Sequence, residues 1–302
     1  MYDIIIIGGG PAGLTAALYA RRQNKSVLVL EKNSFGGQTV YSPKIENYPG
    51  FVEMSGIEFS DKLVDQVLHQ GAELEPAEAL SIADHGTFKT VVTDSGDYEA
   101  TAVILACGAK HRMLGLEGEE DYVGNGISFC AVCDGAFYKD KAVAVIGGGN
   151  SALQEALLLS QTCAQVDIIQ NLGFLTGEEK LIEALKTKEN VSITLNTVVD
   201  GLLGDGQLSA IRLRSTQTGA ITEKALDGMF VAIGLVPDTE VAKDLLTLDD
   251  RGYVPAAEGC ETAVPGIYVA GDCRTKTIRQ IATAIADGAT AALAASKFVE
   301  SK

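Results

Sequence analysis

The pattern of apolar positions predicts the same strand–helix–strand arrangement twice along the chain. The predicted elements are strands at 3–7 and 26–30 around a helix at 14–23, then strands at 142–146 and 166–169 around a helix that ends near Cys163. These strands are continuously apolar rather than alternating, as expected of parallel sheets that are covered on both faces. The chain is therefore predicted to be an α/β protein.

A glycine-rich turn follows the first strand of each copy. Gly8, Gly10 and Gly13 form a GxGxxG pattern, and Glu31 ends the next strand. In this pattern the glycines allow a tight turn, a close approach to a pyrophosphate and close helix packing, while the acid accepts from a ribose hydroxyl. The second turn, 147–152, reads GxGxxA, but no acid ends its second strand. The sequence predicts a complete dinucleotide site at the start of the chain and an incomplete one in the middle.

A later segment predicts that the first domain is interrupted. Residues 266–272 form an apolar strand that delivers an aspartate at its carboxyl end, and a long alanine-rich helix is predicted over 277–298. A strand that returns to the first sheet implies two Rossmann-like three-layer domains, the second inserted into the first. The expected limits are 1–114 with 244–302 for the outer domain and 115–243 for the inserted one.

Cys130-Ala131-Val132-Cys133-Asp134-Gly135 lies between the two glycine turns. Two thiols at this spacing can close a small disulfide and reopen it as a dithiol, and Asp134 can handle the proton. Half of a zinc site and a purely structural disulfide are the alternatives. Zinc needs four ligands, and the remaining candidates are scattered: Cys107, Cys163, Cys260, Cys273, His69, His85 and His111. We therefore expect no metal, and the neighbouring nucleotide sites favour a redox role.

Composition narrows the partners and the compartment. A net charge of −16 argues against nucleic acid, which requires a basic face. No run approaches the ~18 apolar residues of a membrane span, and the apolar start leads directly into glycines, as a buried strand does. Six cysteines in 302 residues are too few for a disulfide-stapled secreted fold, which predicts a cytoplasmic protein.

Over essentially its whole length, the sequence closely resembles the low-molecular-weight thioredoxin reductases of bacteria. The matching stretches are GGGPAG at 8–13, GGQ at 36–38, ENYPGF at 46–51, CAVCDG at 130–135, GGGNSA at 147–152 and AGDCRTKTIRQIATAIADG at 270–288. The resemblance implies a homodimeric flavoenzyme that binds one FAD per subunit in the outer domain and reduces thioredoxin or a thioredoxin-like protein.

The resemblance also implies which residues surround FAD. They are Gly8, Gly10, Pro11, Ala12, Gly13, Glu31, Lys32, Gly37, Gln38, Asn47, Gly108, Gly271, Asp272, Arg279, Gln280 and Ile281. Gln38 and Asn47 would lie near the flavin ring, and Asp272 would bind the ribitol. The N–H groups at the start of the last helix could stabilise the negative charge of reduced flavin.

By the same resemblance, reduced FAD passes two electrons to the disulfide, with Cys133 facing the flavin. The Cys130 thiolate then attacks the partner's disulfide, and Cys133 resolves the mixed disulfide. Asp134 would donate or accept the proton; the alternative is that it is only a turn residue before Gly135. The inserted domain is expected to rotate between the two half-reactions. A non-catalytic FAD-binding redox sensor is the remote alternative.

One departure from the family pattern concerns the electron donor. Members that use NADPH carry H-R-R-x-x-x-R after the second strand of the inserted domain, where this chain has Gln170 to Thr176 without a basic residue. Losing contacts of ~1.5–3 kcal/mol each disfavours NADPH, and Gln170 replaces the acid that would favour NADH. A ferredoxin-linked enzyme is the favoured interpretation; NADPH or NADH bound through non-standard contacts is the alternative.

An acidic ferredoxin would need a local basic cluster on which to dock. Two clusters are candidates, Lys110-His111-Arg112 and the group formed by Arg274, Lys276 and Arg279. Of the remaining cysteines, Cys107, Cys163 and Cys273 are predicted to be buried small hydrophobes. Cys260 is predicted to lie in a surface loop as a free thiol.

Overall fold

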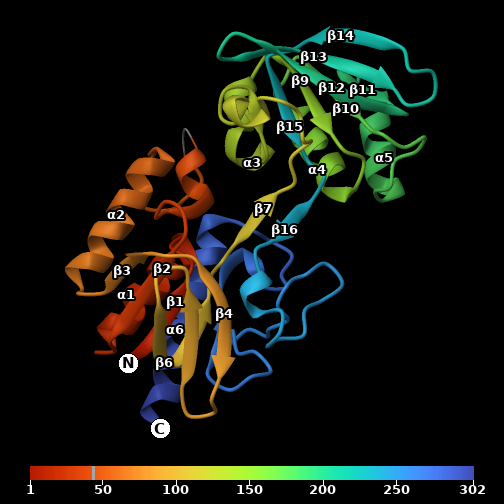
Figure 1. Cartoon of the computed structure of the whole chain (residues 1–302). Helices are drawn as coiled ribbons and strands as arrows, with labels where there is room; N and C mark the ends of the chain where they lie inside the picture. Colours follow the sequence, from red (N-terminus) through yellow and green to blue (C-terminus); the bar gives the residue numbers. More distant parts are fainter. Residues whose placement is uncertain (43–44) are drawn as a thin grey trace. The chain divides into compact units, whose positions relative to one another are not determined.

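The computed structural model describes residues 1–42 and 45–302. The chain forms two compact units (Figure 1). Unit 1 contains residues 1–110 and 236–302, and unit 2 contains residues 111–235. Each unit is built on its own sheets and is described separately.

Unit 1 is built on a seven-stranded sheet with the path β3-β2-β1-β6-β5-β4, in which β17 also pairs with β6. The elements belonging to this unit, with the connecting strands β7 and β16, are β1 (Tyr2–Ile7), α1 (Pro11–Arg22), β2 (Val27–Glu31), η1 (Gly37–Tyr41), α2 (Gly56–His69), β3 (Glu73–Pro76), β4 (Ala79–Asp84), β5 (Lys89–Thr93), β6 (Asp97–Leu105), β7 (Ala109–His111), β16 (Leu235–Pro237), η4 (Glu240–Ala242), β17 (Ile267–Val269), η5 (Gly271–Cys273) and α6 (Ile281–Glu300). Strands β3, β2, β1, β6 and β17 run parallel.

Both faces of the parallel strands of unit 1 are covered, which explains their continuous apolar sequence. Ile4 and Ile6 of β1 pack in a core cluster with residues of α1 and α6. Ile5 and Ile7 face the opposite cluster, which includes Ala242 of η4. The alternation of side chains along a strand therefore supplies two separate cores.

Helix α6 packs directly against α1. A Cβ atom on Gly288 would lie 2.1 Å from the Ala12 carbonyl oxygen, so a glycine is required for this close approach. The helix begins at Ile281, not at Thr277 as predicted, because Gln280 has an extended backbone and forms a capping box with Thr283. No helix in the described part of the chain, α6 included, is long and apolar enough to cross a bilayer.

Unit 2 repeats the layered arrangement. Its elements are η2 (Glu119–Tyr122), β8 (Ile127–Ser128), α3 (Ala131–Asp134), η3 (Gly135–Tyr138), β9 (Ala142–Ile146), α4 (Asn150–Leu159), β10 (Gln165–Ile169), α5 (Glu179–Lys186), β11 (Val191–Thr194), β12 (Thr197–Gly204), β13 (Leu208–Ser215), β14 (Ile221–Ala225) and β15 (Gly228–Val231). The parallel sheet has the order β11-β10-β9-β15-β8, and β12-β13-β14 form an antiparallel sheet. Helix α4 ends at Leu159, earlier than the predicted Cys163.

The two faces of β9 pack against different elements. Val143 and Val145 pack in the cluster that contains residues of α4 and α5. Ala144 and Ile146 pack in the cluster that contains residues of β12 and β13. Both units are therefore three-layer α/β structures, and the predicted fold class of two Rossmann-like domains is confirmed.

Candidate functional site

The first glycine turn leads into α1 through exposed backbone. Gly8 has φ +111°, and a Cβ atom there would lie 2.2 Å from the Ala106 carbonyl oxygen, so no other residue fits. Gly10 is the N-cap and Pro11 begins the helix, and no side chain of the described residues caps it. Gly37 approaches so closely that its Cβ would be 3.1 Å from the Gly10 Cα atom. The turn and the helix start form a cradle suited to a pyrophosphate.

Glu31 ends β2 as a buried carboxylate and holds the glycine turn itself. Its Oε2 accepts from the Gly9 N–H at 2.7 Å, and its Oε1 accepts from the Asn33 N–H at 2.8 Å. A carboxylate offers about four acceptor positions, so further ones are available for ribose hydroxyls. Lys32 pairs with Asp238 at 2.9 Å.

Asp272, in η5, presents an unpaired carboxylate oxygen. Its Oδ1 is buried and has no hydrogen-bond partner among the described residues. Burial raises the pKa of Asp272, and the nearby charges of Lys276 and Arg279 act in the opposite direction. Arg279 donates to the Asp272 carbonyl oxygen at 3.2 Å and lies over the Tyr253 ring at 4.2 Å. A hydroxyl-bearing ligand would supply the donor that Oδ1 lacks.

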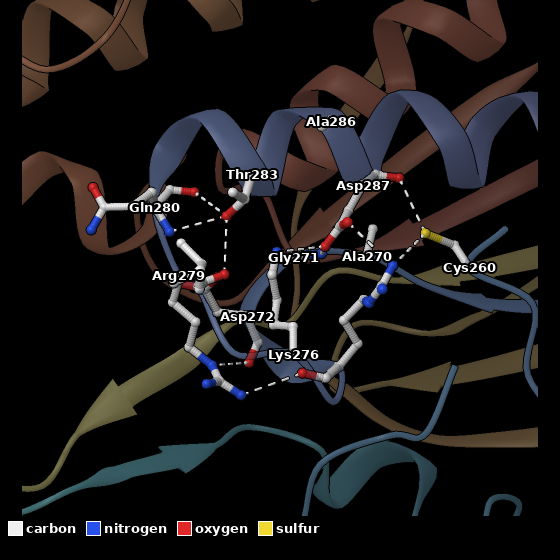
Figure 2. Close-up of polar contacts among 12 residues, drawn as sticks. Cys260, Ala270, Gly271, Asp272, Lys276, Arg279, Gln280, Thr283, Ala286 and Asp287 are labelled. Atoms are coloured by element: carbon white, nitrogen blue, oxygen red, sulfur yellow. Dashed lines mark hydrogen bonds and ion pairs between the residues drawn. The ribbon is translucent and has the colours of Figure 1, made fainter. Parts of the chain in front are cut away.

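Asp287, on α6, anchors the loop that carries Asp272 (Figure 2). Its carboxylate accepts from the Gly271 N–H at 3.1 Å, from Lys276 at 2.7 Å and from Arg274 at 3.2 Å. The Arg274 and Lys276 side chains are only 13% and 10% exposed. The predicted basic docking cluster at Arg274 and Lys276 is therefore wrong, because both cations are paired inside unit 1. Sequence reasoning did not single out Asp287, although it lies within the family-matching stretch 270–288.

The cysteines outside the CxxC segment are free, and the predictions for Cys260 and Cys107 are not met. Cys260 is fully buried at φ +64°, and its sulfur accepts from Arg274 at 3.1 Å. It is not an exposed loop thiol, because it packs against the α6 side of the core. Cys163 and Cys273 are buried as predicted, whereas Cys107 is only partly buried.

Other predicted cofactor residues meet near the start of α6. Asn47 donates to the Gln280 side-chain oxygen at 3.2 Å, which joins segments 233 positions apart. Gln280 is the N-cap of α6 and Ile281 its first residue. Gln38 is exposed in η1, and Gly108 follows β6 with φ +69°. Gly108 follows the parallel strand β6 and Gln280 follows the parallel strand β17, so both lie beyond the carboxyl ends of these strands, where α/β proteins bind nucleotides.

Cys130 and Cys133 form a disulfide around α3. The Cys133 N–H donates to the Cys130 sulfur at 3.2 Å. The Cys130 N–H donates to the Ser128 hydroxyl at 3.2 Å, and that hydroxyl donates to Asp134 Oδ2 at 2.6 Å. Asp134 Oδ1 is buried without a partner in the described chain, and burial raises the pKa of this carboxyl. Asp134 can therefore hold a proton beside the disulfide.

Metal ligation receives no geometric support. In residues 1–42 and 45–302, no group of three or more His, Cys, Asp or Glu side chains is arranged to hold an ion.

The loop that carries the two cysteines lies on the surface of unit 2, since Val132, between them, is 60% exposed.

The second glycine turn differs from the first at its acidic position. Gln170 is buried against Gly148 and donates to the Phe174 carbonyl oxygen at 3.3 Å. Phe174 is 62% exposed. Glu178 exchanges two hydrogen bonds with Asn150, the first residue of α4. No lysine or arginine occurs between Gln170 and Glu178, so the loop offers a carboxylate rather than cations at the helix start.

The comparisons with known proteins agree with this arrangement of turns and cysteines. The family model for pyridine nucleotide-disulphide oxidoreductases matches residues 2–288, and the chain belongs to this family. The thioredoxin reductase of Listeria monocytogenes is 42% identical over 301 residues, covering 99% of this chain and 94% of that one. The thioredoxin reductase of Treponema pallidum is 38% identical over 300 residues, covering 99% and 97%.

Among solved structures, the thioredoxin reductase of Streptococcus pyogenes matches with a TM-score of 0.94 and 39% identity, covering 100% of this chain and 99% of that one. Within the family, the chain is a flavoenzyme of the thioredoxin reductase type. Family membership implies FAD. The cradle at Gly10, the available acceptor positions of Glu31 and the unpaired Asp272 oxygen fit that group.

The predicted basic cluster at Lys110-His111-Arg112 is weaker than its sequence suggests. His111 stacks on Phe129 with ring centroids 4.6 Å apart, and burial lowers its pKa to about 4. Lys110 pairs with Asp238 at 3.5 Å. At neutral pH, His111 contributes no charge to this cluster.

Because burial lowers the pKa of His111 from its ordinary value of 6.5 to about 4, acid should destabilise unit 2. The unfolded chain binds the proton first, so stability present above pH 6.5 is lost as the pH falls toward 4. Between about pH 7.5 and 5, His111→Phe should lose about 2 kcal/mol less stability than wild type, measured by urea unfolding. His85→Phe is the matched control, since His85 stacks on Phe88 but is exposed. An identical acid response in His111→Phe and wild type would contradict the assignment.

Proposed function

We propose that this chain reduces thioredoxin or a thioredoxin-like protein through Cys130 and Cys133, using electrons delivered by FAD bound to unit 1. The observation that carries the proposal is the Cys130–Cys133 disulfide with the buried Asp134 carboxyl beside it. The names of the related proteins support thioredoxin as the partner. Homodimer formation stays a prediction.

The proposed FAD site uses residues of unit 1 alone. FAD, when bound, supplies the reversible uptake of two electrons. The N–H groups at the start of α1 would bind the pyrophosphate, and Glu31 would accept from the ribose. Asp272 would accept from the ribityl chain, while Asp287 holds its loop in place. Asn47 and Gln280, already joined by a hydrogen bond, would lie at the flavin ring.

Asp272→Ala should weaken FAD binding without destabilising the apoprotein. Removing a buried oxygen without a partner should raise the melting temperature of the apoprotein or leave it unchanged. The same change removes a hydrogen-bond acceptor for FAD, so the dissociation constant should rise about tenfold or more. Flavin fluorescence measures the affinity, and the exposed Asp250→Ala is the control. Unchanged FAD affinity would exclude Asp272 from the site.

The cysteine pair would act by thiol–disulfide exchange. Reduction breaks the Cys130–Cys133 bond with two electrons and two protons. The Cys130 thiolate, which the Cys133 N–H can stabilise, then attacks the partner's disulfide and forms a mixed disulfide. Cys133 attacks the Cys130 sulfur, releases the partner as a dithiol and restores the starting bond. Asp134 holds the proton that moves to and from these sulfurs.

The two single cysteine variants should behave differently toward thioredoxin. Cys133→Ser should trap a mixed disulfide through Cys130, visible by non-reducing electrophoresis and mass spectrometry. Cys130→Ser should trap little, because the proposed attacking sulfur is missing. The double serine variant should lose thioredoxin reduction while retaining FAD. Retained thioredoxin reduction by the double variant would reject the disulfide relay.

The proposed electron donor is not NADPH. The support is the loop from Gln170 to Glu178, which lacks cations, buries a glutamine at the ribose position and places a carboxylate at the start of α4. A 2′-phosphate would meet no charge-assisted donor there and would be repelled by Glu178. A ferredoxin-type donor is favoured over NADH, because the loop also lacks the acidic residue that would bind the ribose of NADH. Arg112 is exposed, but the other cations proposed for docking are largely paired.

Anaerobic titration of the flavin absorbance tests the donor. NADPH and NADH at micromolar concentrations should leave the flavin oxidised, whereas reduced ferredoxin should bleach it. The triple variant Asn171→Arg, Leu172→Arg, Thr176→Arg should gain at least about tenfold in NADPH affinity, since one charge-assisted contact is worth ~1.5 kcal/mol or more. NADH is the control, because it has no 2′-phosphate for the arginines. Rapid bleaching of the wild-type protein by NADPH would reject this proposal.

A further inference from the structure

A second carboxyl group, Glu155, lies on α4, which packs against the disulfide loop of unit 2. Ala131, located between the two cysteines, packs in one buried cluster with Ala152 and Ala156 of α4, the helix that carries Glu155. The Glu155 oxygen Oε2 is buried and has no hydrogen-bond partner in the described part of the chain. Ser128 and Asp134 hold the CxxC loop by hydrogen bonds, and α4, which carries Glu155, packs against Ala131 of the same loop.

The charges around Glu155 are negative. Burial raises the pKa of Glu155 to about 8, and the charge of Asp134 adds to the shift. On η3, burial and the charges of Asp134 and Asp227 raise the pKa of Tyr138 to about 12, so this phenol is neutral. Lys141 lies over the Tyr138 ring at 5.6 Å rather than against a carboxyl. Two buried carboxyl groups without a cationic partner disfavour simultaneous ionisation.

We propose that Glu155 is a second proton-holding and positioning residue of the redox cysteines, acting together with Asp134. This inference rests on the proposed disulfide cycle. Breaking the Cys130–Cys133 bond takes two electrons and two protons to give two thiols, and one proton leaves when Cys130 becomes a thiolate. Protonated Glu155 is neutral and does not repel the Cys130 thiolate, whereas ionised Glu155 adds a negative charge that disfavours the thiolate. The thiol and Glu155 therefore titrate as a coupled pair.

The test is the pH dependence of Cys130 alkylation in the FAD-bound protein after reduction with dithiothreitol. Iodoacetamide labelling, followed by peptide mass spectrometry between about pH 6 and 10, reports the thiolate fraction. Wild type should show two coupled steps. Glu155→Gln should show one step at lower pH, with several-fold faster labelling at about pH 8. Glu155→Asp should restore two steps, and the exposed Glu183→Gln on α5 should match wild type.

A Glu155→Gln profile that superimposes on wild type overturns the inference and leaves the proposed function standing. Failure of dithiothreitol to produce a Cys130–Cys133 dithiol overturns both. If Glu155→Gln does not fold, infrared difference spectra of Asp134→Asn, disulfide against dithiol, give a second readout. A protonated-carboxyl band that changes on reduction supports Glu155 as the proton holder, and the absence of such a band rejects it.

Discussion

The hydrogen bond from the Gly9 N–H to Glu31 sets the geometry on which the first nucleotide site depends. It ties the end of β2 to the turn after β1 and so fixes where the uncapped start of α1 lies. In unit 2, the corresponding position is Gln170, whose amide packs against Gly148 and donates to Phe174 instead. The two turns share a backbone path but differ in charge. One fold therefore provides a complete nucleotide site in unit 1 and an incomplete one in unit 2.

The proposed chemistry of this chain relies on carboxyl groups that have a buried oxygen without a hydrogen-bond partner. Asp272 in unit 1, and Asp134 and Glu155 in unit 2, each have a buried oxygen without a hydrogen bond in the described structure. Such oxygens reduce stability when they are ionised, and a native protein retains few of them. Their positions at a hydroxyl-binding loop and beside a disulfide are consistent with ligand binding and proton transfer. Asp287 shows the opposite case, a carboxylate whose partners are all internal.

Local pattern was sufficient to predict most of the fold and part of the site. Continuous apolar strands, the glycine turns and the CxxC spacing depend on neighbours in sequence, and these elements were predicted correctly. The start of α6 was missed because the Gln280–Thr283 capping box overrides the apolar pattern. Cys260, Arg274 and Asp287 were misjudged or missed because their burial depends on pairing between β17, η5 and α6. Glu155 was missed because nothing in the sequence of α4 shows that this helix packs against the CxxC loop.

The internal pairing of Arg274 and Lys276 has a consequence for encounters with other proteins. The chain carries a net charge of −16, and two of its cations neutralise Asp287 inside unit 1 instead of facing solvent. The solvent-exposed surface therefore carries two fewer positive side chains than the sequence alone suggests. An acidic partner approaches against long-range repulsion, which salt screens over a Debye length of about 8 Å at physiological ionic strength. Association with such a partner therefore becomes faster as salt is added, the reverse of the salt dependence of an electrostatically steered pair.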